Sequence, residues 1–215
     1  MRIVLAILGR DLRRHAAGGG AVLPVMFFLL VAVLFPFAVG PDGALLSRTG
    51  GGALWMAALL AALMPVDRLI AADVQAGILD QLALRGVPDE TVAAAKLLAH
   101  WLSFGPPLMI AAVVAGGLLN LDGAGLMRVE LGLLLGTPAL AAIGLVTAAL
   151  TSGLGGGSAL TGLLALPLTI PVLIFGAGAL GSDSAAALKL LAAVSLLMVA
   201  GAPFAAGAAM RSVRR

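Results

Sequence analysis

The sequence predicts an all-α, polytopic membrane protein with six transmembrane helices. Hydrophobic residues make up 61% of the 215 residues and charged residues only 11%, against roughly 25% charged residues in a soluble domain. So few charged side chains cannot cover a water-facing surface. The chain also contains six apolar stretches, each close to the ~20 residues that a helix needs to cross a bilayer. These stretches and their loops use nearly the whole chain, so we expect a single transmembrane domain over 1–215.

The N-terminal segment, 1–20, is predicted to be a helix that lies in the membrane interface. Ile3 and Ile7 recur at helical spacing, and Asp11 and four arginines occupy much of the remaining surface. A helix with one apolar and one charged side rests on the headgroup region. The next apolar run, 21–40, exceeds the ~7–15 residues of a signal-peptide core, so we expect a retained span and not a cleaved signal.

Six spans follow from the apolar runs and from the polar or glycine-rich segments between them. They are predicted at about 21–40, 53–70, 97–119, 129–150, 159–180 and 186–209. Short loops are expected at 41–52, 120–123, 151–158 and 181–184, and the one long polar connection at 67–96. Gly132 and Gly136 form a small-x-x-x-small pattern, which lets helix backbones approach closely.

The distribution of Lys and Arg predicts the orientation of the chain. With the N-terminus inside, the inner segments carry ten of these residues and the outer loops three. Cytoplasmic loops are enriched in Lys and Arg, so both termini are predicted in the cytoplasm. The end clusters of arginine suit anionic lipid headgroups. No basic stripe with interleaved aromatic residues is present, and we therefore expect no nucleic-acid partner.

Residues 73–85 predict a short amphipathic helix on the inner side. Val74, Ile78 and Leu82 share one face, and a different face carries Asp73, Gly77, Asp80 and Gln81. Gly86 is placed to end the helix. Such a helix either rests on lipid or docks a partner. Acidic residues gain nothing from an anionic leaflet, which favours docking, and we interpret the segment as a coupling helix.

The sequence contains no energy source of its own. No ionisable residue falls at a predicted span centre, whereas ion-coupled transporters normally place some there. The phosphate-binding pattern G-x-x-x-x-G-K-[ST] is also missing. If the protein moves a substrate uphill, another subunit must supply the energy.

His100 and Trp101, at the start of the third span, are candidate cofactor-contacting residues. They could serve as an axial heme ligand and a stacking partner, or as a plain interfacial anchor. An intramembrane hydrolase using Ser103, Ser152 or Ser158 is a weaker alternative. His100 could share a helix face with Ser103 as its base, but no acid or oxyanion motif supports the reaction. We expect no catalytic residue, no metal site and no cofactor bound directly.

Several ordered segments resemble the CcmB family, the membrane subunit of the cytochrome c maturation ABC transporter, a heme exporter of ABC-2-type fold. They are FFLLVAVLFPFAVGP (27–41), WMAALLAALMPVDRLIAADVQAGILDQLAL (55–84), KLLAHWL (96–102), LLLGTPALAAIG (133–144), LPLTIPVLIF (166–175) and APFAAGAAMR (202–211). The departures are confined to 86–95, 151–158 and 180–200. The alternative is an ABC-2-type exporter of a drug, lipid or polysaccharide.

The resemblance implies a multi-pass protein of the bacterial inner membrane that acts with several partners. These are a CcmA-like ATPase that binds ATP, a second copy of the chain, CcmC-like and CcmD-like membrane proteins, and functionally the CcmE-like heme chaperone. Heme would be the cargo of the complex, exported or released on its chaperone. The residues implied to contact the ATPase are Asp73, Gln75, Gly77, Asp80 and Gln81.

Overall fold

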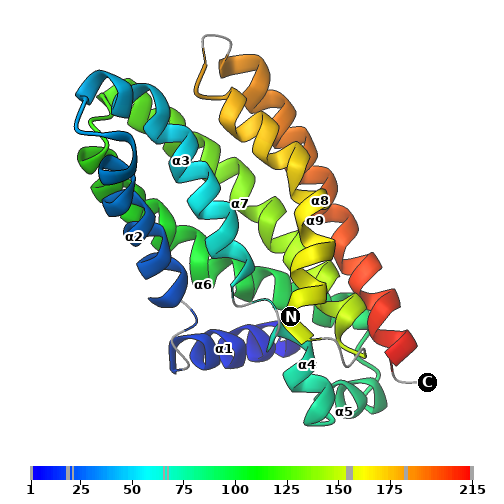
Figure 1. Ribbon diagram of the computed structural model, residues 1–215. Helices are drawn as coiled ribbons and strands as arrows, with labels where there is room; N and C mark the ends of the chain where they lie inside the picture. Colours follow the sequence, from blue (N-terminus) through cyan, green and yellow to red (C-terminus); the bar gives the residue numbers. More distant parts are fainter. Residues whose placement is uncertain are drawn as a thin grey trace.

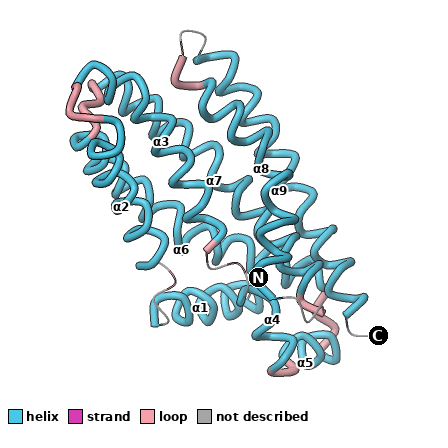
Figure 2. Tube along the Cα trace, viewed as in Figure 1, coloured by secondary structure: helices cyan, strands magenta, loops and turns pink. Residues whose placement is uncertain are grey.

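The computed structural model describes residues 2–17, 20, 22–64, 66, 68–153, 157–181 and 184–213, and its regular structure over these ranges is entirely helical (Figures 1 and 2). The helices are α1 (Arg2–Ala17), α2 (Val22–Val39), α3 (Gly43–Leu63), α4 (Arg68–Gln75), α5 (Ile78–Leu84), α6 (Asp89–Leu118), α7 (Gly123–Thr151), α8 (Gly157–Gly178) and α9 (Ser184–Val213). The predicted all-α fold class is confirmed.

Six helices in the described part of the chain, α2, α3, α6, α7, α8 and α9, are long and apolar enough to cross a membrane. This confirms the predicted number of spans. Helix α7 forms the centre of the bundle and packs against α3, α6, α8 and α9. The most apolar window of α7 is 72% buried, whereas those of α2 and α9 are only 17% buried. The outer helices therefore present apolar side chains to lipid.

The predicted loop 41–52 is wrong over most of its length, because α3 begins at Gly43, ten residues before the expected start at 53. Asp42 caps this helix: its Oδ1 accepts hydrogen bonds from the backbone N–H groups of Ala44 (2.9 Å) and Leu45 (3.3 Å). A side-chain cap supplies the bonds that a helix start otherwise lacks. The glycine run at 50–52 then lies inside the helix.

Helix α6 also starts earlier than the predicted span, at Asp89 and not at 97. Pro88 precedes it and Asp89 and Glu90 occupy its first turn, an arrangement that favours a helix start. Helix α7 starts at Gly123, six residues before 129, where Asp122 Oδ1 accepts from the Gly125 N–H at 2.7 Å.

The second span also ends earlier than predicted, at Leu63 and not at 70. The remaining bounds agree more closely with the sequence. The interfacial helix expected over 1–20 is α1, and the fifth and sixth spans are α8 and α9. Parts of three predicted turns, at 18–19, 154–156 and 182–183, lie outside the described residues, as do Asp67, Arg214 and Arg215.

The coupling helix predicted over 73–85 is two helices, α4 and α5, so the single-helix prediction is wrong. The helix that contains Asp73 begins at Arg68, and the chain breaks at Gly77, which has a φ of 66°. Glycine adopts this left-handed conformation without a steric penalty and so ends a helix. Gly86, with a φ of 71°, follows α5, as predicted for its terminator.

The short helices gather at one end of the bundle. Helix α1 runs across the ends of the spans, α4 and α5 lie beside and beyond it, and α9 ends there too (Figure 1). The connections α2–α3, α6–α7 and α8–α9 lie at the opposite end. Both ends of the described chain are thus on the same side, and the assignment of that side to the cytoplasm stays a prediction.

Candidate functional site

A buried ion cluster joins three of the helices at this end of the bundle. Lys96 Nζ of α6 lies 2.5 Å from Asp73 Oδ2 of α4 and 3.1 Å from Asp11 Oδ2 of α1. The same ammonium group donates to the Leu69 carbonyl at 3.0 Å. The three charged side chains are at most 3% exposed. A buried charge persists only when it is paired and hydrogen-bonded, and this ammonium group has all three bonds that it can donate.

Two arginines of α1 complete the cluster. Arg10 Nη2 lies 2.6 Å from Asp73 Oδ2 and 2.7 Å from Asp11 Oδ1. Arg14 Nη1 lies 2.7 Å from the other oxygen of Asp73. Arg10 and Arg14 are four residues apart and therefore share a helix face. We call these five residues, Arg10, Asp11, Arg14, Asp73 and Lys96, the ion cluster.

The cluster keeps Asp73 ionised. Burial alone would raise its pKa, but the charges and hydrogen bonds of Lys96, and then of Arg10, outweigh burial and hold the pKa of Asp73 below its usual value. Removing one partner of such a pair leaves a buried charge uncompensated and costs about 3–5 kcal/mol. The cluster therefore holds α1, α4 and α6 together.

Helices α4 and α5, which we call the docking unit, carry the predicted partner-contacting residues. Leu79 is 2% exposed, and Val74 and Leu82 pack against the hydrophobic core. The predicted apolar face is thus present, although on two helices. Three of the five residues predicted to meet an ATPase, Gln75, Asp80 and Gln81, are exposed, and Gly77 is half-buried. Their contact with a partner stays a prediction.

Asp73 differs from the other four, and the expectation that it lies on an exposed face is wrong. Its side chain is fully buried against Arg10, Arg14 and Lys96. Its place on the polar side of α4 is correct, but α1 and α6 cover that side. Asp73 therefore fixes the docking unit to the spans and does not offer itself to a partner.

His100 and Trp101 lie inside the bundle. His100 is fully buried, with its ring centroid 5.0 Å from that of Phe104 and 6.3 Å from that of His15. Neither of its ring nitrogens has a hydrogen-bond partner among the described residues. Trp101 is half-buried, and its Nε1 donates to Thr137 Oγ1 at 3.0 Å. Burial excludes an interfacial-anchor role for His100, and heme ligation by either residue stays a prediction.

The serine–histidine pair of the hydrolase alternative is not formed. Ser103 Oγ donates to the backbone carbonyl of His100 at 2.7 Å, and the imidazole takes no part in that bond. A serine nucleophile needs a base within hydrogen-bond reach. The geometry gives no support for hydrolysis at these residues.

A glycine cradle between α3, α7 and α8 holds Trp55. A Cβ added at Gly136 would lie 2.4 Å from the Trp55 ring, one at Gly176 2.7 Å and one at Gly132 3.0 Å. The predicted packing role of Gly132 and Gly136 is thus realised by a buried indole that fills their side of α7. This contact locks α3 to the centre of the bundle.

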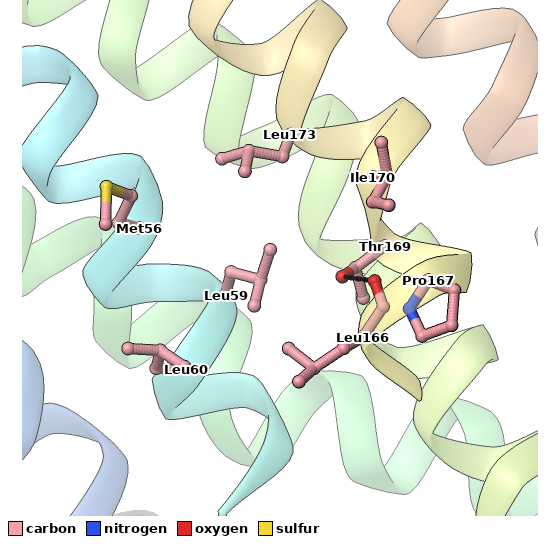
Figure 3. A pocket seen from close by; sticks show the side chains of 8 residues that line it. All are labelled: Met56, Leu59, Leu60, Leu166, Pro167, Thr169, Ile170 and Leu173. Carbon is pink, nitrogen blue, oxygen red and sulfur yellow. Dashed lines mark hydrogen bonds between the residues drawn. The ribbon is translucent and has the colours of Figure 1, made fainter. Parts of the chain in front are cut away.

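An apolar groove of about 470 Å³ lies between α3 and α8 (Figure 3). Its lining residues are Met56, Leu59, Leu60, Leu166, Pro167, Thr169, Ile170 and Leu173. The one hydroxyl among them, on Thr169, donates to the Leu166 carbonyl at 2.7 Å. The groove therefore suits a hydrocarbon group and offers no charge or imidazole to a polar ligand.

Sequence reasoning missed the ion cluster, although two signals were available. Asp11 is an isolated acid among the arginines of an interfacial helix. Arg10 and Arg14 are four residues apart, so their side chains can reach the same anion. Lys96 was assigned to a polar connection, whereas it lies inside α6. Asp73 lies 23 residues before Lys96 and 59 to 63 residues after the two arginines, and Asp11 lies 85 residues before Lys96, so no local pattern pairs the helices.

Known proteins match this chain over nearly its whole length. The model of the CcmB protein family matches residues 2–213. A Paracoccus denitrificans protein named Heme exporter protein B is 50% identical over 96% of this chain and 97% of its own. Proteins of that name from Bradyrhizobium diazoefficiens and Haemophilus influenzae are 49% and 43% identical over at least 97% of both chains. Because the family model matches from the start of α1 to the end of α9, the chain belongs to the CcmB family.

Proposed function

We propose that this chain is the membrane subunit of an ABC-type heme exporter for cytochrome c maturation. The observation that carries the proposal is identity of 43–50% with proteins named Heme exporter protein B along nearly the whole chain. These relatives favour heme over the drug, lipid or polysaccharide cargo of the alternative. The complex would export heme or release its heme-loaded chaperone.

Energy would come from a separate, CcmA-like ATPase, to which ATP binds. The sequence contains no phosphate-binding loop, and the docking unit presents Gln75, Asp80 and Gln81 to solvent. This exposed polar surface supports the proposal that α4 and α5 form the coupling element. The location would be the inner membrane, with this end of the bundle in the cytoplasm.

The ion cluster gives the docking unit a rigid connection to the spans. A displacement of α4 would act on α6 through Asp73 and Lys96. At its first turn α6 is tied to α9, because Arg211 Nη1 lies 2.5 Å from Glu90 Oε1 and 3.9 Å from Asp89 Oδ2. Helix α9 packs extensively on the central α7. Motion imposed on the docking unit would therefore reach the centre of the bundle.

The assembly would include a second copy of this chain, CcmC-like and CcmD-like membrane proteins, and a CcmE-like chaperone on the opposite side. The resemblance of the chain supports these partners, and the printed names of its relatives support a heme-export system. Lipid-facing helices such as α2 and α9, with few buried residues, leave ample surface for membrane partners.

Charge reversal of Asp80 tests the docking claim. Asp80→Lys should reduce copurification of the CcmA-like ATPase several-fold while membrane insertion is unchanged, because the exposed carboxylate would no longer meet a cationic partner group. Lys189→Glu is the matched control, because this exposed residue lies near the start of α9, and α9 begins at the other end of the bundle (Figure 1). Unchanged copurification by Asp80→Lys would refute docking through this face.

Complementation tests the cargo. In cells that lack their own heme exporter protein B, the wild-type chain, expressed with its ATPase, should restore heme-loaded chaperone and c-type cytochromes, both measured by heme absorbance. An inserted, ATPase-bound chain that restores neither would refute the assignment of heme.

A further inference from the structure

His100 is the one side chain of the described residues with two buried polar atoms that both lack a hydrogen-bond partner. Its ring is fully buried where α1, α6 and α7 meet. The ring centroid lies 6.3 Å from that of His15 on α1, and a Cβ added at Gly144 on α7 would lie 3.3 Å from His100 Nε2. A buried polar group without a protein partner indicates a functional role or a site for a water or an ion. We therefore asked which small ligand suits this position.

The second imidazole, His15, has the hydrogen-bonding pattern of a metal ligand. Its Nδ1 lies 2.7 Å from the backbone carbonyl oxygen of Asp11. Because a carbonyl oxygen can only accept, Nδ1 carries the hydrogen and Nε2 keeps its lone pair. Histidines that bind metal ions hold their other ring nitrogen in this way, which fixes the tautomer and the ring orientation. His15 is half-buried, so an ion can reach the pair from the membrane interface.

The separation of the two rings fits a single ion between them. An imidazole nitrogen binds a metal ion at ~2.0–2.1 Å with the ring centroid about 1.1 Å behind it, so two rings that face one ion head-on have centroids about 6.4 Å apart. The observed separation of the His15 and His100 centroids is 6.3 Å. One nitrogen from each ring would then bind the ion in a nearly linear arrangement.

Ligand number and local charge favour a monovalent copper ion. The described residues contain no group of three or more His, Cys, Asp or Glu side chains that could hold a metal ion, whereas zinc takes at least three protein ligands. Imidazole suits copper, and Cu(I) accepts two ligands in a line. The ion cluster, one helical turn away, contains three cations and two anions. Its net positive charge makes a divalent ion less favourable than a monovalent one.

Heme iron and water are the competing occupants. A heme needs an open plane around its iron, and the close contact of the His100 ring with Phe104, at 5.0 Å between centroids, favours a bare ion. A water molecule can also bridge two imidazole nitrogens, but it would bind no more tightly to this pair than to other buried polar groups. Binding measurements distinguish these occupants from copper.

We propose that His15 and His100 form a two-coordinate site for Cu(I) that joins α1 to α6 beside the ion cluster. The proposal replaces the sequence-based expectation of no metal site, and it does not depend on the proposed function. The ion would satisfy one nitrogen of each ring and would hold the N-terminal helix on the bundle.

Copper loading of the full chain tests the proposal. The chain contains only two histidines and no cysteine, so it must be purified without a histidine tag. In nanodiscs, under anaerobic and reducing conditions, the wild-type chain should take one Cu(I) ion from a chromophoric chelator. X-ray absorption of the loaded protein should show two nitrogen ligands and no sulfur. Sulfur ligation would point to the eight methionines and would overturn the site.

Two variants make the loading test specific. His15→Asn can keep an N–H donor for the Asp11 carbonyl but has no Nε2, so its affinity for Cu(I) should fall at least about a hundredfold, beyond the loss typical of an outer-shell partner. Ser103→Ala is the matched control, because Ser103 is buried one turn from His100 but donates only to a backbone carbonyl. This variant should bind Cu(I) as the wild type does.

Thermal melting gives an independent readout of the same site. Because a ligand that binds only the folded state stabilises it, Cu(I) should raise the Tm of the wild-type chain and leave that of His15→Asn unchanged. Absence of copper from the wild-type chain, or equal affinity of wild type and His15→Asn, would overturn the proposal and leave water as the occupant. Histidine-dependent binding of Zn²⁺ as tight as that of Cu(I) would overturn the monovalent assignment.

Discussion

Asp73 occupies the most demanding electrostatic position in the described part of the molecule. Its fully buried carboxylate meets cations from α1 and α6, and its charge makes the burial of Lys96 tolerable. An aspartate at this point therefore stabilises three helices at once, whereas an exposed aspartate such as Asp80 stabilises none of them.

Neutralisation of Asp73 should be costly. Asp73→Asn keeps the shape but removes the charge that Lys96 approaches to 2.5 Å, so we expect a loss of about 3 kcal/mol in the free energy of unfolding. Asp80→Asn, on the surface, should change it by less than about 0.5 kcal/mol. Unfolding of the purified chain in detergent, followed by fluorescence of its two tryptophans, measures both. Equal stability of the two variants would contradict a structural role for Asp73.

Acidification should reduce the difference in the free energy of unfolding between wild type and Asp73→Asn. The pKa of Asp73 is lowered in the folded protein, so its stabilisation is fully present above the ordinary pKa of about 3.9. It is lost as the pH falls below that value through the folded pKa. The gap in stability between wild type and Asp73→Asn should thus be constant from about pH 5 to 7 and shrink below about pH 4. A gap that widens on acidification would contradict this sign.

At the scale of elements, α3, α7 and α8 are held in register by an indole that occupies the space of three absent side chains. Two glycines one turn apart on α7 and a third on α8 meet Trp55. In the absence of a hydrophobic driving force between helices in lipid, close packing of this kind provides much of their association.

A methyl group in the cradle should disturb that packing. Gly136→Ala would bring a Cβ within 2.4 Å of the Trp55 ring, and overpacking of this kind typically costs about 1–3 kcal/mol. Gly52→Ala in α3, where nothing lies within 4 Å, should instead stabilise slightly, because alanine favours helix. Thermal melting of the two variants measures the contrast. Equal stability of Gly136→Ala and Gly52→Ala would contradict tight packing of Trp55 against Gly136.

At the scale of the whole molecule, an even number of spans places the two termini and the docking unit at one end of the bundle (Figure 1). The ten Lys and Arg residues of the predicted inner segments include those of α1, of the connection 67–96 and of the end of α9. These segments share that end, so the positive-inside rule predicts that this end faces the cytoplasm.

Labelling of single cysteines tests this orientation. Gln75→Cys in the docking unit and Gly123→Cys at the opposite end, both at exposed positions, should react from opposite sides of the membrane. An impermeant maleimide added to spheroplasts should label only Gly123→Cys, and inside-out vesicles should give the reverse. The inverted result would place the docking unit in the periplasm and remove the basis for ATPase docking.

Composition and local periodicity were enough to predict the features that depend on them alone. Six apolar stretches of bilayer length predict six spans, and glycine, proline and acidic residues marked several helix ends. The prediction failed at two helix ends. The Asp42 cap starts α3 ahead of a glycine run that was expected to be a loop. The left-handed conformation of Gly77 divides the predicted coupling helix into two.

The packing of distant helices sets which polar residues are buried and which side chains they contact. Asp73 looked like a surface acid, because its partners are supplied by α1 and α6, 59 to 63 residues before it and 23 after it. Burial and charge pairing are properties of helix packing between distant segments, and the period of a single helix reports only its own two faces.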